Sequence, residues 1–403
     1  MTTGAARPIR LGIVGARAAA ETHIRAMAHL RGSRAEVVAV AAATRASAEA
    51  FARRHGVPVA LDDYRALCER PDVDVVDVAC PNDLHHEVAI AAARAGKHVI
   101  VEKPLTGYFG AEGEQIEATP REAMLAGALR NADAVLDACR TAGVTLCYAE
   151  NIVYAPAVQK LKRLIEVSGA TLLDLRAEEA HSGSIAAYSR RWRTSGGGSL
   201  LRMGSHPIAT LLHLKHWEGR LRAGRPVRAR SVFADTAALT RLPQVAAEPV
   251  AYLQTGWLDV EDWACALITF DDGTRGTILA SDVSLGGVKN LVTAYMSKGV
   301  AQIAINPNTG MQLYAPDPSV WGQEYISEKV ETRAGWQFPN PVEHWMRGYA
   351  EELTDFVEAI GEGREPLSGG DLARETVAVI YAGYLSAATG RRVDLATVAP
   401  VRA

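Results

Sequence analysis

Three segments of this 403-residue chain carry groups that could do chemistry. Lys103 is the middle residue of a Glu-Lys-Pro triplet, and a lysine amine can donate or accept a proton. Gly12 and Gly15 border a short apolar stretch near the N-terminus, where backbone N–H groups could bind a phosphate. His206 follows a glycine-rich run, and an imidazole can act as an acid or a base. We therefore start from proton transfer and phosphate binding.

Alternating strands and helices must position the first two segments. Such alternation is typical of repeated βαβ units, so we predict a doubly wound parallel sheet in the first third of the chain. Short apolar runs predict strands at 10–15, 36–41, 73–79 and 98–101, and the helical patterns between them cover 21–30, 46–55 and 86–95.

The pattern changes after this sheet. Glycines, acids and a proline interrupt it at 107–123, which we expect to be an inserted surface loop that could reach a substrate entrance. A helix is expected at 124–142 and a strand at 144–149. Alternating apolar residues then favour a half-buried antiparallel sheet. Its predicted strands are 172–178, 263–270 and 276–280, with a hairpin turn at 271–273 and helices at 348–360 and 372–387.

The composition is that of a globular enzyme with two domains. Hydrophobic residues make up 48%, charged residues 22%, and the formal net charge is -3. No aromatic and basic stripe suggests nucleic acid. The start has no signal-peptide pattern and no apolar stretch reaches spanning length, so we expect a cytosolic protein without a membrane partner. The 5 cysteines show no paired spacing and are expected to be core residues.

The glycine turn is an imperfect match to a dinucleotide-binding turn. Gly15 fills the first glycine position, Arg17 stands at the second, and Ala20 at the third. Alanine is tolerable for helix packing, and arginine can donate to phosphate although it crowds the backbone approach. The turn, with Gly12, Ala16 and Ala18, is therefore a candidate pyrophosphate site, and the alternative is a plain strand-to-helix turn.

The end of the second strand bears on the choice of cofactor. An acid usually stands there to bind the ribose hydroxyls of NAD. Here the strand ends in three alanines followed by Thr44 and Arg45. These two residues could hold a 2′-phosphate, which favours NADP over NAD. The alternative is that Arg45 is a solvated residue opening the next helix.

The most specific pattern lies between residues 73 and 105. A strand is followed by the run from Cys80 to His85, and the next strand leads into Glu102, Lys103 and Pro104. These paired motifs closely resemble those of the glucose-fructose oxidoreductase, inositol dehydrogenase and MocA family of oxidoreductases (Gfo/Idh/MocA). The resemblance extends over nearly the whole chain.

The resemblance implies an α/β protein of two domains. The first, at 1–148 with an insert at 107–123, would be a Rossmann domain with a doubly wound parallel sheet. The second, at 149–403, would be an α/β domain with a large, mostly antiparallel open sheet that binds substrate. The nicotinamide of NAD or NADP would lie between them. The exposed sheet face is a common dimerisation surface in the family, so a homodimer or homotetramer is expected.

The resemblance also assigns residues to the cofactor. It implies that Cys80, Pro81, Asn82 and His85 border the dinucleotide, and that Glu102 and Lys103 lie near the nicotinamide.

Lys103 is the residue we expect to carry the proton chemistry. Oxidation of an alcohol requires a base at the hydroxyl oxygen as the hydride leaves. A free lysine has a pKa of about 10.4, and lowering it by about three units costs about 4 kcal/mol. Partial burial and the charge of an oxidised nicotinamide could both contribute. Outside the family, a Glu-Lys-Pro triplet could equally be a solvated turn.

A second catalytic segment departs from the family pattern. After Gly196-Gly197-Gly198, the resemblance implies an acid, a histidine four residues later and often a second acid. His206 matches the family's catalytic or substrate-binding histidine, but Arg202 replaces the first acid. An arginine favours an oxyanion, so we hypothesise an acidic sugar-like substrate paired with Arg202. The alternative is that Arg202 bonds Glu178 or Glu179.

Several further residues are candidates for substrate binding, although packing or exposure would explain each one alone. They share polarity that suits a hydroxyl-rich ligand, and they are His181, Tyr148, Asn151, Tyr188, Trp192 and Trp336. His206, His213 and His216 share a helix face only loosely and have no supporting acid at useful spacing, so we predict no metal site.

The sequence as a whole favours an NAD(P)-dependent dehydrogenase or reductase. It would act on a secondary hydroxyl carbon of a sugar, sugar acid, anhydrosugar or cyclitol. One alternative is a glycoside-cleaving enzyme that retains NAD for transient oxidation and elimination. The other is a non-catalytic dinucleotide-sensing protein.

Overall fold

The computed structural model describes residues 7–30, 35–306 and 311–400, and the chain divides into two compact units. The division differs from the expected boundary near residue 148 in two places. Residues 108–128 belong to the second unit, and 348–374 return to the first. The first unit comprises Met1–Gly107, Leu129–Tyr154 and Gly348–Arg374, and the second comprises Tyr108–Ala128, Ala155–Arg347 and Glu375–Ala403.

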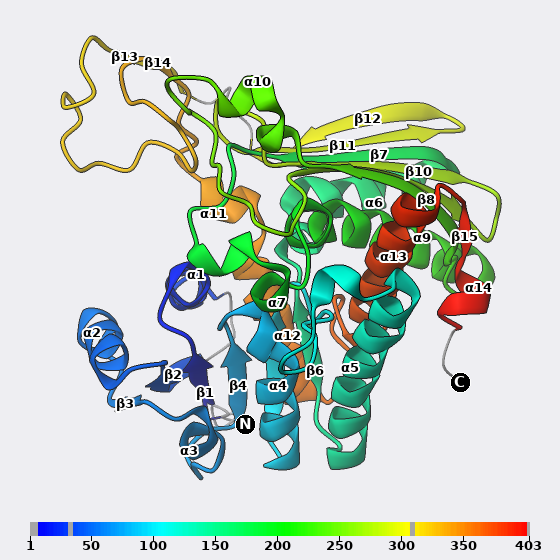
Figure 1. Cartoon of the computed structure of the whole chain (residues 1–403). Helices are drawn as coiled ribbons and strands as arrows, with labels where there is room; N and C mark the ends of the chain where they lie inside the picture. The colour runs from blue at the N-terminus through cyan, green and yellow to red at the C-terminus, as the bar shows by residue number, and fades with distance from the viewer. Residues whose placement is uncertain (1–6, 31–34, 307–310, 401–403) are drawn as a thin grey trace. The chain divides into compact units, whose positions relative to one another are not determined.

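The first unit contains the predicted doubly wound sheet. Its six strands have the order β3-β2-β1-β4-β5-β6, and each neighbouring pair is parallel. Figure 1 shows β1 to β4 of this sheet in shades of blue, with helices beside them. The strands are β1 Ile9–Val14, β2 Ala35–Ala41, β3 Val59–Leu61, β4 Val75–Val78, β5 His98–Glu102 and β6 Leu146–Ala149.

The helices of this unit agree with most of the predicted segments. Helix α1 begins at Ala18, earlier than expected, because its first residues are alanines with the highest helix propensity. Strand β3 and helix α3 were not predicted, since both are too short to show a period. The helices are α1 Ala18–Met27, α2 Arg45–His55, α3 Tyr64–Cys68, η1 Asn82–Leu84, α4 His85–Arg94, η3 Asn151–Tyr154 and α12 Tyr349–Glu362.

The central strands of the first unit are largely apolar because they lie in its core. Leu11, Ile13, Val75 and Val76 are fully buried, as expected where helices cover both faces of a parallel sheet. Burial of each such side chain contributes about 1.5–3 kcal/mol. The central strands therefore hold their carboxyl ends in fixed register.

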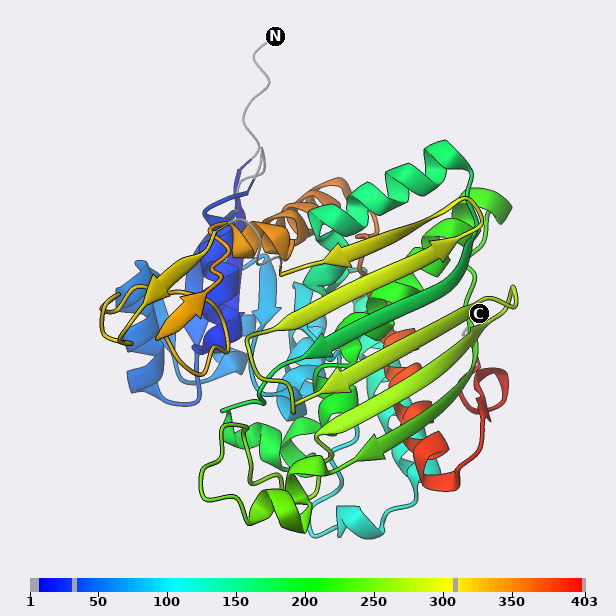
Figure 2. The same ribbon diagram turned by 90° about the horizontal axis from the view of Figure 1, so that it is seen from above.

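The second unit is built on a mixed sheet that is mostly antiparallel. The strand order is β12-β11-β7-β10-β9-β8-β15, and only the β7–β10 pair is parallel. Figure 2 looks onto these strands, which lie side by side in front of helices. Their bounds are β7 Leu172–Ala180, β8 Ala229–Ala237, β9 Trp263–Phe270, β10 Arg275–Ser281, β11 Lys289–Met296, β12 Gly299–Ala304 and β15 Val393–Asp394.

The two faces of this sheet differ. Helix α9 (Ser205–Ala223) packs on β7 and β10, and α6 (Pro156–Ser168) contacts β12. The other face, called the open face here, exposes Phe233, Leu267, Leu291, Tyr295 and Val300. The predicted turn at 271–273 joins β9 to β10, with the Phe270 N–H donating to the Thr274 carbonyl at 3.1 Å.

Smaller elements complete the second unit, and two long helices, α5 and α13, cross the division. The remaining elements are η2 Ile116–Ala118, α5 Arg121–Ala142, η4 Ala187–Arg190, α7 Trp192–Ser195, α8 Ser199–Arg202, η5 Leu239–Arg241, α10 Pro243–Ala246, β13 Leu313–Ala315, β14 Gly335–Gln337, α11 Glu343–Met346, α13 Gly370–Thr389 and α14 Leu395–Val398.

The segment at 107–123 is anchored more firmly than the expected surface loop. Glu114 accepts hydrogen bonds from the hydroxyls of Thr119 and Tyr108 and from the N–H of Ala111. Thr119, then Tyr108, lower the pKa of Glu114 to about 2. The Arg193 guanidinium donates to the Ala111 carbonyl at 2.8 Å. The insert is therefore part of the second unit's framework.

Within the described ranges, no helix is long and apolar enough to cross a membrane.

Candidate functional site

The turn after β1 requires glycine. Gly15 has φ +132°, and its N–H donates to the Ala41 carbonyl at 2.8 Å. A Cβ at Gly15 would lie 2.1 Å from the Ala79 carbonyl oxygen, closer than any side chain tolerates. Gly12 packs closely against α3, where a Cβ would lie 2.5 Å from a Leu67 methyl that could shift. Gly15 thus allows the ends of β1 and β4 to approach each other.

The N-terminus of α1 is suited to an anion. Arg17 is the N-cap residue, it is exposed, and its side chain makes no capping hydrogen bond to α1. The N-cap residue therefore provides no side-chain acceptor for the first N–H groups of the helix, and the helix dipole favours negative charge there. Ala16 and Ala18 add no bulk. The turn fits the pyrophosphate of a dinucleotide. Because NAD and NADP both contain a pyrophosphate, this turn does not distinguish between them.

Thr44 and Arg45 both have structural partners. The Thr44 hydroxyl accepts the Ser47 N–H and caps α2, while Arg45 forms an ion pair with Glu49 at 2.9 Å. The Arg45 pair is exposed and joins residues one helical turn apart. Such pairs contribute only about 0.3–0.5 kcal/mol, so a stronger anion could displace Glu49 at little cost.

His85 connects the turns that follow β4 and β5. Its Nδ1 lies 2.7 Å from the Pro104 carbonyl oxygen, and its Nε2 lies 2.9 Å from that of Cys80. Pro81 precedes η1, in which Asn82 is buried. Burial raises the pKa of the Cys80 thiol to about 12, which leaves Cys80 no role as a nucleophile. His85 therefore acts as a brace between the two turns.

Lys103 lies at the carboxyl end of β5 beside a partly buried acid. Its backbone N–H donates to Glu102 Oε2 at 3.0 Å, and its side chain is partly buried. Glu102 Oε1 lies 3.0 Å from Nε2 of His23. Burial alone would raise the pKa of Glu102, but His23 and then Lys103 outweigh it and hold the pKa below its usual value.

His23 and its second partner, Asp77, were not recognised from the sequence. His23 Nδ1 lies 2.9 Å from Asp77 Oδ2, and both side chains are fully buried. The available signal was Asp77, the one polar residue in the four-residue strand β4. Such residues need buried partners, but the sequence does not say which.

Tyr148 and Asn151 are both buried in the first unit. The Tyr148 N–H donates to the Ser368 carbonyl at 2.9 Å, and its hydroxyl has no hydrogen-bond partner among the described residues. Burial and the charges of Glu150 and Glu102 raise the pKa of Tyr148 well above its usual value. The tyrosine lies near the Glu102 network rather than at the surface.

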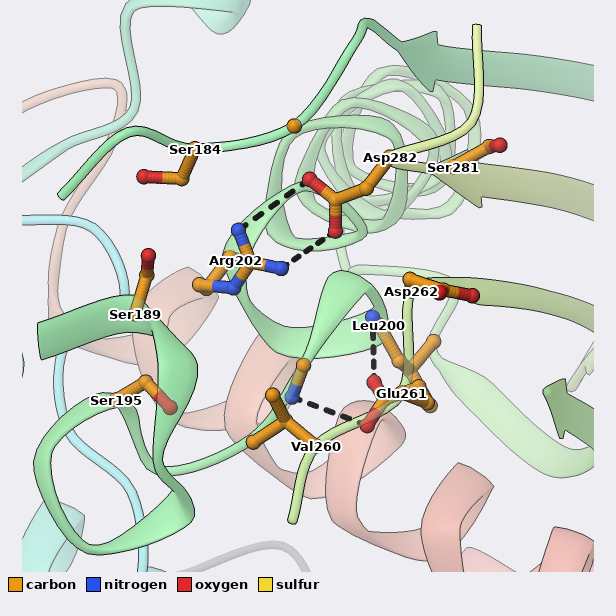
Figure 3. Close-up of polar contacts among 12 residues, drawn as sticks. Ser184, Ser189, Ser195, Leu200, Arg202, Val260, Glu261, Asp262, Ser281 and Asp282 are labelled. Atoms are coloured by element: carbon orange, nitrogen blue, oxygen red, sulfur yellow. Dashed lines mark hydrogen bonds and ion pairs between the residues drawn. The ribbon is translucent and has the colours of Figure 1, made fainter. Parts of the chain in front are cut away.

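In the second unit, a buried glutamate shapes the glycine turn that precedes Arg202. Glu261 accepts the N–H groups of Gly198 at 3.1 Å and Leu200 at 2.9 Å, as Figure 3 shows. The Tyr384 hydroxyl also donates to Glu261. A Cβ at Gly198 would lie 2.0 Å from the Glu261 carbonyl oxygen. The turn and α8 are thereby fixed.

Arg202 faces an acid that sequence reasoning missed. Its guanidinium forms an ion pair with Asp282 at 2.5 Å, and Figure 3 shows both nitrogens directed at the carboxylate. It also stacks over Trp257, 4.7 Å from the ring centroid. Arg202 was expected to bond Glu178 or Glu179 as the structural alternative. Its partner is instead Asp282, which lies just beyond β10. Burial raises the pKa of Asp282, and the Arg202 charge opposes this.

His206 also has a carboxylate nearby. Its Nε2 lies 3.9 Å from Glu179 Oε1, an ion-pair distance longer than a hydrogen bond. The Asn290 amide donates to Glu179 Oε2 at 3.0 Å and orients it. His206 is buried on α9, with its carbonyl accepting the Thr210 hydroxyl. Strand β7 thus supplies an acid near His206, where the following helical positions are Ala209 and Thr210.

His181 and Tyr188 belong to the same polar region of the second unit. His181 Nδ1 accepts the Gly183 N–H at 2.9 Å. Tyr188 is close enough to raise the pKa of Arg202 electrostatically, a smaller effect than burial and Asp282. Lys329 donates to the Gly183 carbonyl at 2.9 Å. The structure therefore brings Arg202 together with Tyr188 and Asp282.

The two tryptophans are not gathered with this group. Trp192 is 2% exposed, and its indole N–H donates to the Tyr108 carbonyl at 3.0 Å. Its ring packs on Tyr384 at 4.7 Å, which makes it a core residue rather than an accessible ligand contact. Trp336 is 64% exposed on β14, and its ring lies 5.5 Å from that of Tyr314.

The histidines that follow His206 on α9 have separate partners. His213 Nε2 lies 3.1 Å from Lys162 Nζ, and His216 forms an ion pair with Glu375 at 2.8 Å. No group of acidic, histidine or cysteine side chains that could hold a metal occurs in the described part of the chain.

Two family models match this chain, one after the other along the sequence. A family model described as an oxidoreductase family with an NAD-binding Rossmann fold matches residues 9–126. The GFO/IDH/MocA C-terminal domain matches residues 158–302. The chain belongs to the Gfo/Idh/MocA family of oxidoreductases, which confirms the family resemblance of its motifs.

Relatives of known activity are moderately similar. Levoglucosan dehydrogenase of Pseudarthrobacter phenanthrenivorans is 28% identical over 77% of this chain and 77% of its own length. Trans-1,2-dihydrobenzene-1,2-diol dehydrogenase of Mus musculus is 28% identical over 83% of this chain and 81% of its own length.

Solved structures share the fold. GenD2 from gentamicin A biosynthesis, in complex with NAD, has a TM-score of 0.77 at 23% identity and covers 97% of both chains. Levoglucosan dehydrogenase with NADH and L-sorbose has a TM-score of 0.72 at 23% identity, covering 96% of this chain and 99% of that one.

Proposed function

We propose that this protein transfers a hydride between NAD(P) and a secondary hydroxyl carbon of a neutral, hydroxyl-rich ring such as a sugar, anhydrosugar or cyclitol. One observation carries the proposal. The Gly15 turn, the His85 turn and Lys103 follow β1, β4 and β5, which are adjacent parallel strands. The carboxyl ends of such strands form one edge, where dinucleotides bind in this class of sheet.

The first unit would hold the dinucleotide. Gly15 and the uncapped N-terminus of α1 would bind the pyrophosphate, and the turns at Asn82 and Glu102 would border the rest. The bound nicotinamide would supply a hydride acceptor or donor.

Lys103 would move the hydroxyl proton. As a base it would take the proton from the alcohol oxygen during oxidation, and as an ammonium it would donate to the carbonyl oxygen during reduction. Glu102 holds its backbone, and Pro104 is tied to His85. His206, oriented near Glu179, is proposed to bind a substrate hydroxyl.

The charge balance around Arg202 supports a neutral substrate. Asp282 already pairs with the guanidinium, so a substrate carboxylate would have to displace it. This revises the acidic substrate expected from Arg202 alone. The similarity to levoglucosan dehydrogenase, a protein named for an anhydrosugar, supports the same choice.

The absence of an acid at the end of β2 favours NADP within this proposal. Arg45 lies in the first turn of α2 and is held by one exposed ion pair, so it could turn to a 2′-phosphate. Thr44 would retain its role as the helix cap.

A panel assay tests the function. Purified protein is mixed with NAD or NADP and with neutral sugars, cyclitols, anhydrosugars and the matching uronates, and nicotinamide reduction is followed by absorbance. We expect turnover with a neutral member, exceeding that of its uronate, and faster with NADP. Turnover confined to uronates would overturn the neutral substrate, and a large preference for NAD would overturn the role of Arg45.

The same assay separates the alternatives. A glycoside-cleaving enzyme would consume substrate without accumulating reduced nicotinamide, and a sensing protein would bind dinucleotide without turnover. The relatives named above are dehydrogenases, which supports the redox function over both.

We also propose a homodimer or homotetramer formed through the open face. Leu267 and Phe233 are cross-strand neighbours there, and both are exposed. Large exposed apolar patches commonly mark interfaces. A cytosolic location is part of the proposal, since Cys68, Cys139 and Cys147 are buried free thiols, as reducing compartments allow.

Leu267→Glu is expected to shift the molar mass measured by light scattering toward that of a single chain, because a charge would be desolvated in the interface. Leu164→Glu on α6 is the matched control, with 49% exposure against 46% for Leu267. Monomeric wild-type protein, or an unchanged assembly in the Leu267 variant, would contradict the proposed interface.

A further inference from the structure

A buried histidine joins two acids in the first unit. His23 of α1 contacts Asp77 of β4 through Nδ1 and Glu102 of β5 through Nε2. Nδ1 is hydrogen-bonded to Asp77 at 2.9 Å. Nε2 lies 3.0 Å from Glu102 Oε1, an ion-pair contact without hydrogen-bond alignment. A buried ring between two carboxylates is stabilised in its imidazolium form.

The surroundings reinforce this charge state. Burial alone would lower the pKa of His23, but Asp77 and then Glu102 raise it well above the usual value. Glu352 of α12 interacts electrostatically with His23 and Glu102, and burial raises its pKa well above its usual value.

Other groups lie at the edge of the cluster. Glu150 follows β6 and interacts electrostatically with Glu352. The charge of Glu102 contributes to the raised pKa of Tyr148 on β6. Lys103 and His85 both act on Glu102, and each lowers its pKa less than His23 does. The strongest link from Glu102 into the interior is therefore the His23 ring.

The contacts form a continuous line toward Lys103. Asp77 orients His23, His23 orients one oxygen of Glu102, and the other oxygen of Glu102 accepts the Lys103 N–H at 3.0 Å. The same helix, α1, begins at the glycine turn. A single rigid element thus connects the candidate dinucleotide turn to the support of the lysine.

We propose that His23, oriented by Asp77, is a positioning residue that holds Glu102 and thereby the backbone of Lys103 in the geometry needed for proton transfer. This inference rests on the proposed role of Lys103. His23 itself touches neither substrate nor dinucleotide in the proposal. It acts by fixing the charged form and the orientation of Glu102.

The role makes a prediction that a merely structural histidine would not share. His23→Gln should lower kcat by about 10-fold to 100-fold, the usual cost of a small misplacement of a catalytic group. The KM for substrate and the Kd for the dinucleotide should change little. His55→Gln is the matched control, since His55 is also paired with an acid in this unit, Glu21, and should leave kcat unchanged.

A double-mutant cycle gives the decisive readout. If His23 acts through Glu102, then adding His23→Gln to Glu102→Gln should lower kcat no further. Asp77→Asn is the second variant, retained in case His23→Gln does not fold. It should lower kcat in the same direction and also lose its effect in the Glu102→Gln background. Equal losses of kcat in both backgrounds would overturn the proposal.

Nitrogen NMR of the histidine side chains tests the charge state without turnover. Both His23 ring nitrogens should remain protonated through neutral pH, and that signal should vanish in His23→Gln. A neutral His23 ring at pH 7 would overturn the proposal. If the wild-type enzyme fails to turn over in the substrate panel while the imidazolium signal is present, the proposed function has failed rather than the His23 network.

Discussion

Lys103→Met is expected to lower kcat by about 10²-fold to 10⁴-fold, the range in which a positioned acid or base contributes. Methionine approximates the volume of the lysine stem but cannot carry a proton. The Glu102 contact uses the backbone N–H of residue 103 and so should persist in the variant. Dinucleotide affinity, measured by fluorescence titration, should stay close to that of the wild type.

Lys298→Met controls for loss of a lysine elsewhere. Lys298 lies in the turn between β11 and β12, where its amine donates to the Ser168 carbonyl at 2.6 Å. This variant should keep full kcat. Retention of wild-type kcat in Lys103→Met would remove Lys103 from the proton chemistry, whatever happens to binding.

Asp282→Asn is expected to destabilise the protein by about 3–5 kcal/mol, the usual cost of breaking a buried ion pair by removing one charge. Arg202 is 8% exposed and would be left without its counter-charge. The free energy of unfolding in urea measures the loss. The same variant should turn over uronates better relative to neutral sugars, since the Arg202 charge would no longer be neutralised by Asp282 and could attract a substrate carboxylate.

Two comparisons define the Asp282 result. Asp174→Asn breaks the exposed Arg176–Asp174 pair in the same sheet, and a pair of that kind contributes only about 0–1 kcal/mol. The double replacement Arg202→Met with Asp282→Leu should recover much of the lost stability, because removing both charges leaves none buried alone. A loss below about 1 kcal/mol in Asp282→Asn would show that Arg202 does not depend on this acid.

Local patterns in the sequence predicted much of the architecture. The apolar runs that became β1, β2, β4 and β5 alternate with helices, and that alternation is sufficient to indicate a parallel sheet. The glycine turn was recognisable for the same reason, since its requirement for Gly15 is local. Short elements such as α3 lack a period and were missed.

Partners distant in the sequence could not be predicted in the same way. Arg202 and Asp282 are 80 residues apart, and His23 and Asp77 are 54 apart. Glu179 was considered only as a partner for Arg202, whereas the register of β7 places it near His206. The parallel pairing of β7 with β10 could not be predicted either. Alternating apolar and polar residues indicate that one face of a strand is buried, but they do not indicate the direction of its neighbour.

A single-turnover measurement tests the central claim most directly. Excess wild-type enzyme is mixed with NADP and a neutral substrate from the panel, and reduced nicotinamide and ketone product are quantified together. We predict equal amounts of reduced nicotinamide and ketone, formed about 10²-fold to 10⁴-fold more slowly with Lys103→Met. Product formed without reduced nicotinamide would contradict hydride transfer as the net reaction, and a wild-type single-turnover rate in the Lys103 variant would contradict the role of the lysine.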